Sequence, residues 1–301
     1  AIAAQIDPVL YPTVEEALID GKSCIKITFS GKDVPYLHNG QAYIRVGDED
    51  KKMNRNELEN MIMAKKKMYW DCEASRLFIR DIDESILKKI LIRGKSAGRI
   101  SFSYTTKEAV LKKLGMIDGK KISNAAAVLF SHKNNLEVQT AVFATESKTT
   151  FLDIRVFEGD LFSILDKIED YVAEKINWNA EIKDFKRIET PEIPLTAIRE
   201  ALVNSLCHRD YTKPESNKIA IFKDRIEIYN FGGLPKGLKP EEFGTKSVLR
   251  NPTIADLLSR SEYIEKMGTG IKKIRRLMSE AGLRPPRFKF GSFFTIIFQR
   301  P

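Results

Sequence analysis

A periodic segment in the C-terminal half of the chain constrains its structure more than any other feature. From Leu195 to His208 the sequence LTAIREALVNSLCH places its apolar residues on one side of an α-helix that can begin after Pro194. Glu200, Asn204 and His208 follow at steps of four residues, roughly 165° from the apolar side at about 100° per residue. We predict an amphipathic helix that packs by one face and presents polar side chains on the other.

Two glycine clusters downstream extend this prediction. Two short strands, expected at 218–222 and 225–229, lead into Asn230-Phe231-Gly232-Gly233, and Gly268-Thr269-Gly270 precedes a helix expected at 271–281. Glycines at a strand end and a helix start let a backbone approach a ligand closely, and helix N-termini favour phosphate. Each element has a second interpretation, since the polar helix face is also typical of a solvated surface and each glycine cluster of a simple turn.

The order of these segments resembles the GHKL (histidine-kinase-like) ATPases, which carry Glu and Asn on one helix and then two glycine boxes separated by a lid. Four motifs are similar to the divergent ATP-binding domain of RecG-like transcriptional regulators: Arg199-Glu200-Ala201-Leu202-Val203-Asn204, His208-Arg209-Asp210-Tyr211, Arg250-Asn251-Pro252 and Gly268-Thr269-Gly270. The resemblance covers about residues 191–301 and implies a Bergerat-type α/β sandwich that binds ATP and Mg²⁺.

The resemblance also implies a role for individual residues. Asn204 would hold Mg²⁺ through its amide oxygen, and Glu200 would orient or deprotonate an attacking water. Asn230 stands where the family has Asp; an amide oxygen also accepts from the adenine amino group, but base selectivity stays open. Arg250 either reaches the phosphates or pairs with a carboxylate, and Asp210 either shapes the pocket mouth or ends the helix. The remaining nucleotide-binding residues implied are Gly232, Gly233, Gly268, Thr269 and Gly270.

The N-terminal part has a different character. Strands are expected at 22–30 and 41–47, with a turn at 31–33 between them, and a helix should start at Asn54 with Glu57 closing a capping box. Pro35-Tyr36 and Tyr43-Ile44-Arg45-Val46-Gly47 resemble the second half of the Schlafen-type Alba-like DNA-binding domain. We expect the first half, with the acidic residues of its ribonuclease members, to precede Ala1, so no nuclease carboxylate is assigned.

Positive charge is concentrated in one stretch. Residues 51–121 contain 18 Lys and Arg against 9 Asp and Glu, which accounts for the whole net charge of +9. Such asymmetry favours a polyanionic partner, and DNA is the expected one. The alternative is a solvated face of lysine-rich helices. The candidate nucleic-acid residues are Arg45, Lys65, Lys66 and Lys67.

The rest of the chain indicates a multidomain α+β protein. Helices are expected at 84–93, 106–116 and 160–176, strands at 125–130, 138–144 and 152–157, and a linker or edge strand up to Pro191 and Pro194. We predict three domains: residues 1–68 (Alba-like half), 69–158 (mixed α/β) and 159–301 (ATP-binding sandwich).

Several classes of protein are excluded or disfavoured. The sequence has no apolar run of about 18 residues, no secretory signal pattern and no G-x-x-x-x-G-K-[ST] phosphate loop, so we expect a cytoplasmic protein without a membrane partner or a P-loop motor. Cys24, Cys72 and Cys207 are too scattered for a zinc site or a disulfide framework. The predicted function is ATP-binding transcriptional regulation with DNA binding, and family members often add a winged helix, which would follow Pro301. The alternatives are an ATPase that couples hydrolysis to closure of a homodimer and a scaffold that binds no nucleotide.

Overall fold

The computed structural model describes residues 6–7, 12–28, 36–46, 48–58, 69–235, 237–246, 248–264 and 269–301. The chain forms two compact units, residues 1–68 and 69–301, which are described separately. Within the described residues, no helix is both long and apolar enough to cross a membrane.

The first unit consists of small antiparallel pairs. β1 (Ile6–Asp7) pairs with β4 (Leu37–His38), β2 (Thr13–Ile19) with β3 (Lys22–Thr28), and β5 (Tyr43–Val46) with β6 (Glu49–Lys52). The strand expected at 22–30 therefore pairs with the strand before it, because Asp20 and Gly21 both have positive φ and form a tight turn. The predicted capping box is confirmed, since Asn54 and Glu57 exchange backbone-to-side-chain hydrogen bonds of 2.8 and 2.9 Å. The turn expected at 31–33 lies outside the described residues.

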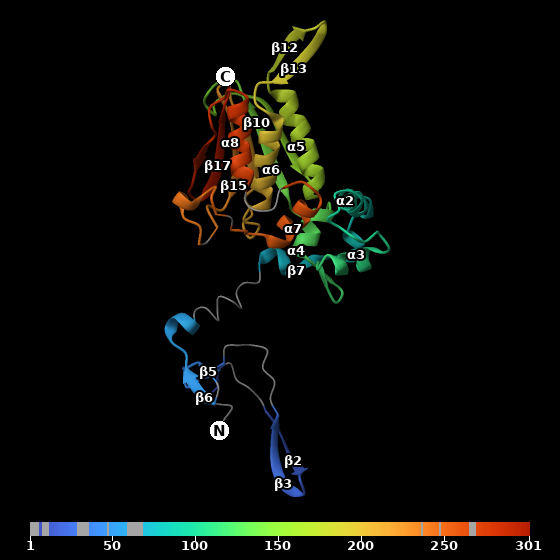
Figure 1. Cartoon of the computed structure of the whole chain (residues 1–301), viewed down its shortest axis with the longest axis vertical. Helices are drawn as coiled ribbons and strands as arrows, with labels where there is room; N and C mark the ends of the chain where they lie inside the picture. The colour runs from blue at the N-terminus through green and yellow to red at the C-terminus, as the bar shows by residue number, and fades with distance from the viewer. Residues whose placement is uncertain are drawn as a thin grey trace. The chain divides into compact units, whose positions relative to one another are not determined.

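The second unit is built on a six-stranded mixed sheet in the order β11-β10-β14-β15-β17-β16. Its strands are β10 (Glu137–Phe143), β11 (Phe151–Glu158), β14 (Asn217–Ile221), β15 (Arg225–Phe231), β16 (Arg287–Lys289) and β17 (Phe293–Gln299). Only the β10–β14 pair is parallel among the pairs of this sheet. Helices α5 (Leu161–Lys175), α6 (Leu195–Cys207) and α8 (Gly270–Glu280) lie side by side over one face (Figure 1).

The remaining elements of this unit surround the lower end of that layer in the view of Figure 1. A small sheet, β7-β9-β8, combines β7 (Ala74–Phe78), β8 (Ile117–Asp118) and β9 (Lys121–Ser123), next to α2 (Glu84–Ser96), α3 (Lys107–Lys113), α4 (Asn124–Phe130) and α7 (Pro252–Arg260). At the other end β12 (Trp178–Lys183) and β13 (Lys186–Pro191) form a projecting hairpin where a linker or edge strand was expected.

Two expectations differ from this architecture. Residues 125–130 form a helix instead of a strand: Ser123 caps it by accepting from the Ala126 N–H at 3.2 Å, and its alanines favour a helix. A short apolar run that is buried on every side has no hydrophobic periodicity, so its sequence does not distinguish a helix from a strand. The boundary expected after residue 158 also does not separate two sheets, because β10 and β11 precede it and β14 to β17 follow it in one sheet.

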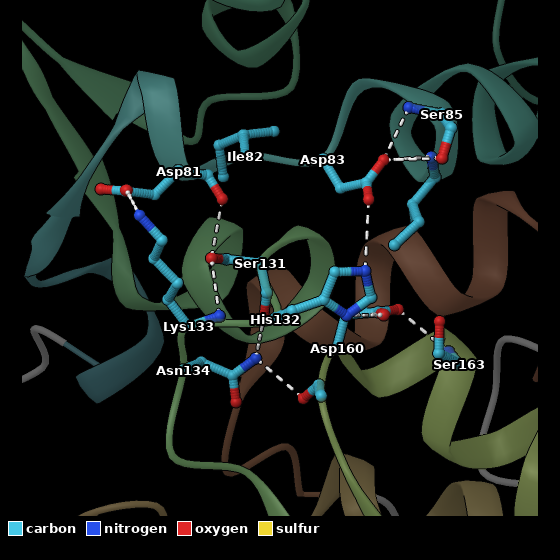
Figure 2. Close-up of polar contacts among 12 residues, drawn as sticks. Asp81, Ile82, Asp83, Ser85, Ser131, His132, Lys133, Asn134, Asp160 and Ser163 are labelled. Carbon is cyan, nitrogen blue, oxygen red and sulfur yellow. Dashed lines mark hydrogen bonds and ion pairs between the residues drawn. The ribbon is translucent and has the colours of Figure 1, made fainter.

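A histidine joins the starts of two helices in this unit. Figure 2 shows His132 between Asp83 and Asp160, with Nε2 3.2 Å from one carboxylate and Nδ1 3.1 Å from the other. Asp83 also caps α2 through the Ser85 N–H, and Asp160 caps α5 through the Ser163 N–H. The segment after α4 thereby holds α2 next to the helical layer on the large sheet.

Candidate functional site

A pocket of about 100 Å³ lies where α6, β15, the start of α8 and the described residues of the chain between β15 and α7 meet. Four of the residues expected to bind nucleotide line it, although they come from three distant parts of the sequence: Asn204, Asn230, Gly233 and Gly270. The rest of the wall is mainly apolar and includes Leu234, Phe243, Ile271, Ile274, Phe294 and Ile296. An apolar pocket with a few convergent polar groups is typical of a small-molecule site.

Asn230 supplies the most informative polar atom of the pocket. Its side chain projects from β15, is 2% exposed, and its Oδ1 accepts no hydrogen bond within the described residues. Buried amide oxygens in native proteins are nearly always paired, since an unpaired one costs about 1–3 kcal/mol. Because Asn230 also lines the pocket, its amide is a group that a bound molecule can contact there.

His208 is the second polar group at the pocket and follows the last residue of α6. Its Nδ1 is buried without a hydrogen-bond partner in the described parts of the chain. Burial, with a smaller contribution from the nearby Arg250 charge, lowers the pKa of His208 from 6.5 to about 4. The imidazole is therefore neutral at pH 7, and the pocket wall carries no charge at this point.

Glu200 and Asn204 form a hydrogen-bonded pair on α6. The Asn204 Nδ2 donates to Glu200 Oε1 at 3.2 Å, and Lys273 of α8 lies 3.4 Å from Glu200 Oε2. Because a carboxylate only accepts, the amide nitrogen must face Glu200, and the amide oxygen of Asn204 is the atom that can act as a metal ligand. Glu200 is 5% exposed, so it lies behind the pocket wall in this state.

Gly270 brings the start of α8 against this pair. A Cβ at this position would lie 2.5 Å from Glu200 Oε1 and 2.9 Å from Asn204 Nδ2. Thr269 is the N-cap residue of α8, whereas Gly268 lies outside the described residues. The N-terminus of α8, which favours anions, therefore faces the polar side of α6 next to the pocket.

Contacts inside the protein explain why residues 232 and 233 are glycines. At Gly232, where φ is +88°, a Cβ would meet the Arg250 guanidinium at 2.5 Å, and at Gly233 it would meet the carbonyl oxygen of Gly291 at 2.2 Å. Arg250 itself donates to the Gly233 carbonyl at 2.7 Å and pairs with Asp210 at 3.3 Å. Of the two roles left open for Arg250, this structure shows the pairing with a carboxylate.

The other motif residues around the pocket make structural contacts. Asn251 donates to the carbonyls of Cys207 and Arg209 at 2.8 and 2.9 Å, and Tyr211 donates to the Leu206 carbonyl at 2.8 Å. Asp210 accepts from Thr212 in the turn after α6, as one of its two interpretations required. These bonds satisfy carbonyls at the C-terminal end of α6 and fix its direction toward the pocket.

The candidate nucleic-acid residues belong to the first unit, whereas the pocket lies in the second. Arg45 pairs with Asp50 at 3.0 Å on the exposed β5–β6 hairpin of the first unit, and Lys65, Lys66 and Lys67 lie outside the described residues. Several basic residues of α2 and α3 contact their own chain: Lys89 pairs with Asp166, and Lys107 donates to the Ile82 carbonyl. These contacts agree with the alternative of lysine-rich helices on a solvated face.

Lys273, Phe243 and Lys246 are among the residues that the structure brings to the site and that the sequence did not predict. Lys273 pairs with Glu200, while Phe243 and Lys246 line the pocket from the segment between β15 and α7. Lys273 could have been found from its place one turn after Gly270, on the side of α8 that faces α6. Phe243 had no comparable signal, because its segment has no periodicity.

Comparison with known proteins bears on the part of the chain that holds this pocket. Residues 215–298 match the family described as "Putative ATP-dependent DNA helicase recG C-terminal". This match indicates an ATPase-like C-terminal domain. The DIP2311 protein from Corynebacterium diphtheriae, whose crystal structure is known, is similar over 99% of this chain, with a TM-score of 0.67 and 23% sequence identity. This likeness shows the fold alone, and the chain spans 61% of that protein's length. No curated protein sequence matches the chain.

Proposed function

We propose that the pocket binds an adenine nucleotide together with Mg²⁺, with the base against the apolar wall and the phosphates at the start of α8. The observation that carries this proposal is the unpartnered Oδ1 of Asn230, a residue that lines a mainly apolar pocket. The exocyclic amino group of adenine is a donor of the kind this oxygen lacks. The match to an ATP-dependent family supports the same assignment.

The residues present fit the metal as well as the base. Asn204 offers an amide oxygen, a hard ligand suited to Mg²⁺, which would neutralise phosphate charge when bound. Glu200 would hold Asn204 in place through the hydrogen bond between them and would orient water if the nucleotide is hydrolysed. DNA binding, transcriptional regulation and ATP turnover stay predictions from the sequence.

Calorimetric titration with ATP and GTP in the presence of Mg²⁺ tests the assignment of Asn230. We expect ATP to bind more tightly than GTP, and Asn230→Ala to weaken ATP binding about tenfold to a hundredfold, since about 1–3 kcal/mol is lost with one buried hydrogen bond. Asn179→Ala, on the exposed face of the β12–β13 hairpin, is the matched control. Undiminished ATP binding by a folded Asn230→Ala variant would contradict the proposal.

The roles of the α6 residues require a separate experiment. We expect Asn204→Ala to remove the part of ATP affinity that depends on Mg²⁺, because it deletes the ligand oxygen together with the hydrogen bond to Glu200. Glu200→Gln should retain binding and lose any hydrolysis, since Gln still accepts from Asn204 and Lys273 but takes up no proton. Titrations with and without Mg²⁺ and a phosphate-release assay measure the two effects. Equal hydrolysis by Glu200→Gln and wild type would reject Glu200 as the base.

A further inference from the structure

Strand β11 forms the outer edge of the large sheet, with no strand beyond it among the residues that the structure describes. β11 pairs with β10 on one side, and its other side is an edge of the sheet. Edge strands present unpaired backbone N–H and C=O groups, and proteins usually protect them by shortness, proline, bulges or inward charges. β11 has eight residues, FLDIRVFE, without proline. Leu152 is an extra residue in the pairing with β10, because Val142 pairs with Asp153 and Phe143 with Phe151. The regular part of the strand, residues 153–158, is long enough to accept another strand.

One face of β11 exposes a row of apolar side chains. Leu152, Ile154 and Val156 are 67%, 58% and 50% exposed, and Ile154 and Val156 alternate with the charged residues in the regular part of the strand. The loop between β10 and β11 covers the inner strands of this face, where Lys148 contacts the Tyr229 ring and Arg225 donates to the Glu146 carbonyl. At β11 itself the row stays exposed to water. A partner strand would bury part of this apolar surface, which is energetically favourable.

The other face of β11 carries charges of opposite sign two residues apart. Asp153 lies 3.0 Å from Lys175 of α5, and Arg155 lies over the Tyr171 ring of the same helix. Asp153 and Arg155 stand at equal distances along the strand from Ile154. A strand with this arrangement is complementary to its own antiparallel copy.

We propose that β11 pairs antiparallel with β11 of a second copy of the chain, around a two-fold axis at Ile154. In this register Asp153 of each copy faces Arg155 of the other, and Ile154 faces itself. The interface is isologous and closes at two copies, as a two-fold axis requires. It joins the two large sheets into one and does not involve the nucleotide pocket.

Sedimentation velocity of the 301-residue chain over a range of concentrations tests the pairing. We expect a species of twice the 34.3 kDa chain mass for wild type and of 34.3 kDa for Ile154→Lys, which places two like charges at the axis. The matched control is Ile182→Lys, which is equally apolar and 81% exposed on β12 but lies outside the interface, and should remain dimeric. A wild-type chain that stays at 34.3 kDa throughout, or a dimeric Ile154→Lys variant, overturns the proposal.

A charge exchange tests the register. Asp153→Arg and Arg155→Asp each give a strand that repels its own copy, so each variant alone should be monomeric. A one-to-one mixture should restore the doubled mass, because the Arg-Arg strand of one variant faces the Asp-Asp strand of the other. Circular dichroism of each variant verifies the fold, and restoration in the mixture itself requires folded partners. A mixture that stays monomeric, or single variants that dimerise as wild type does, rejects this register and the proposal with it.

Discussion

We expect the free energy of unfolding to fall by about 3 kcal/mol more in the wild-type chain than in a His208→Gln variant as the pH drops from 7 to 4. In the folded chain, burial and the Arg250 charge lower the pKa of His208 from 6.5 to about 4. The unfolded chain, with the ordinary pKa, binds a proton below pH 6.5 that the folded chain does not bind. Lowering the pH through this window therefore favours unfolding.

Urea unfolding at pH 7, 6, 5 and 4 measures the effect. Gln is neutral at every pH, so the difference between the two proteins isolates the imidazole. The carboxylates, including Asp83, are present in both proteins, and their contribution cancels. Stability curves that remain parallel from pH 7 to pH 4 would show that His208 takes up a proton in the folded chain.

The second large effect is expected at the first glycine box. Gly233→Ala should destabilise the chain by about 3 kcal/mol, because its Cβ would lie 2.2 Å from a backbone oxygen of Gly291 that no side-chain rotation can move. Part of the pocket wall would shift with it, so nucleotide binding should weaken as well. Thermal and urea unfolding give the loss of stability.

Gly291→Ala is the control from the opposite side of the same contact. A Cβ there has its nearest neighbour at 4.0 Å and fits without displacement. We expect this variant to be within about 1 kcal/mol of wild type. If both variants lose a similar amount of stability, the segment around residue 291 does not accept added side chains in general. The contact between Gly233 and Gly291 would then not explain the loss of stability in Gly233→Ala.

The sequence was most informative where burial imposes a period. The 3.6-residue repeat of Leu195–His208 predicted α6. The strands expected at 138–144, 152–157, 218–222 and 225–229 agree with β10, β11, β14 and β15 within a few residues. The repeat also separated Asn204 from the apolar side, and the structure places it in one pocket with Asn230, Gly233 and Gly270. What those residues bind stays a prediction.

Contacts between distant segments could not be predicted in the same way. Gly232 and Gly233 were expected to let the backbone approach a ligand. In the structure Gly232 instead leaves room for the side chain of Arg250, which follows 18 residues later, and Gly233 for the backbone of Gly291. Lys273 reaches Glu200 only because α8 lies next to α6. Periodicity describes the faces of one element and carries no information on which other element meets them.

The parallel pairing of β10 with β14 has a consequence for how the chain acquires its structure. Val138 pairs with Asn217, about 80 residues later, and α5, α6 and the β12–β13 hairpin are all made in between. Closing so long a loop costs conformational entropy before the contacts between β10 and β14 can form. The pairing of these two strands is therefore expected to be a slow step of folding. During synthesis the β10–β11 hairpin leaves the ribosome before β14. One side of β10 therefore stays unpaired until β14 has been made. A fragment that starts after residue 158 would have the converse defect, with β14 as an exposed edge, and would be prone to aggregate before it could fold.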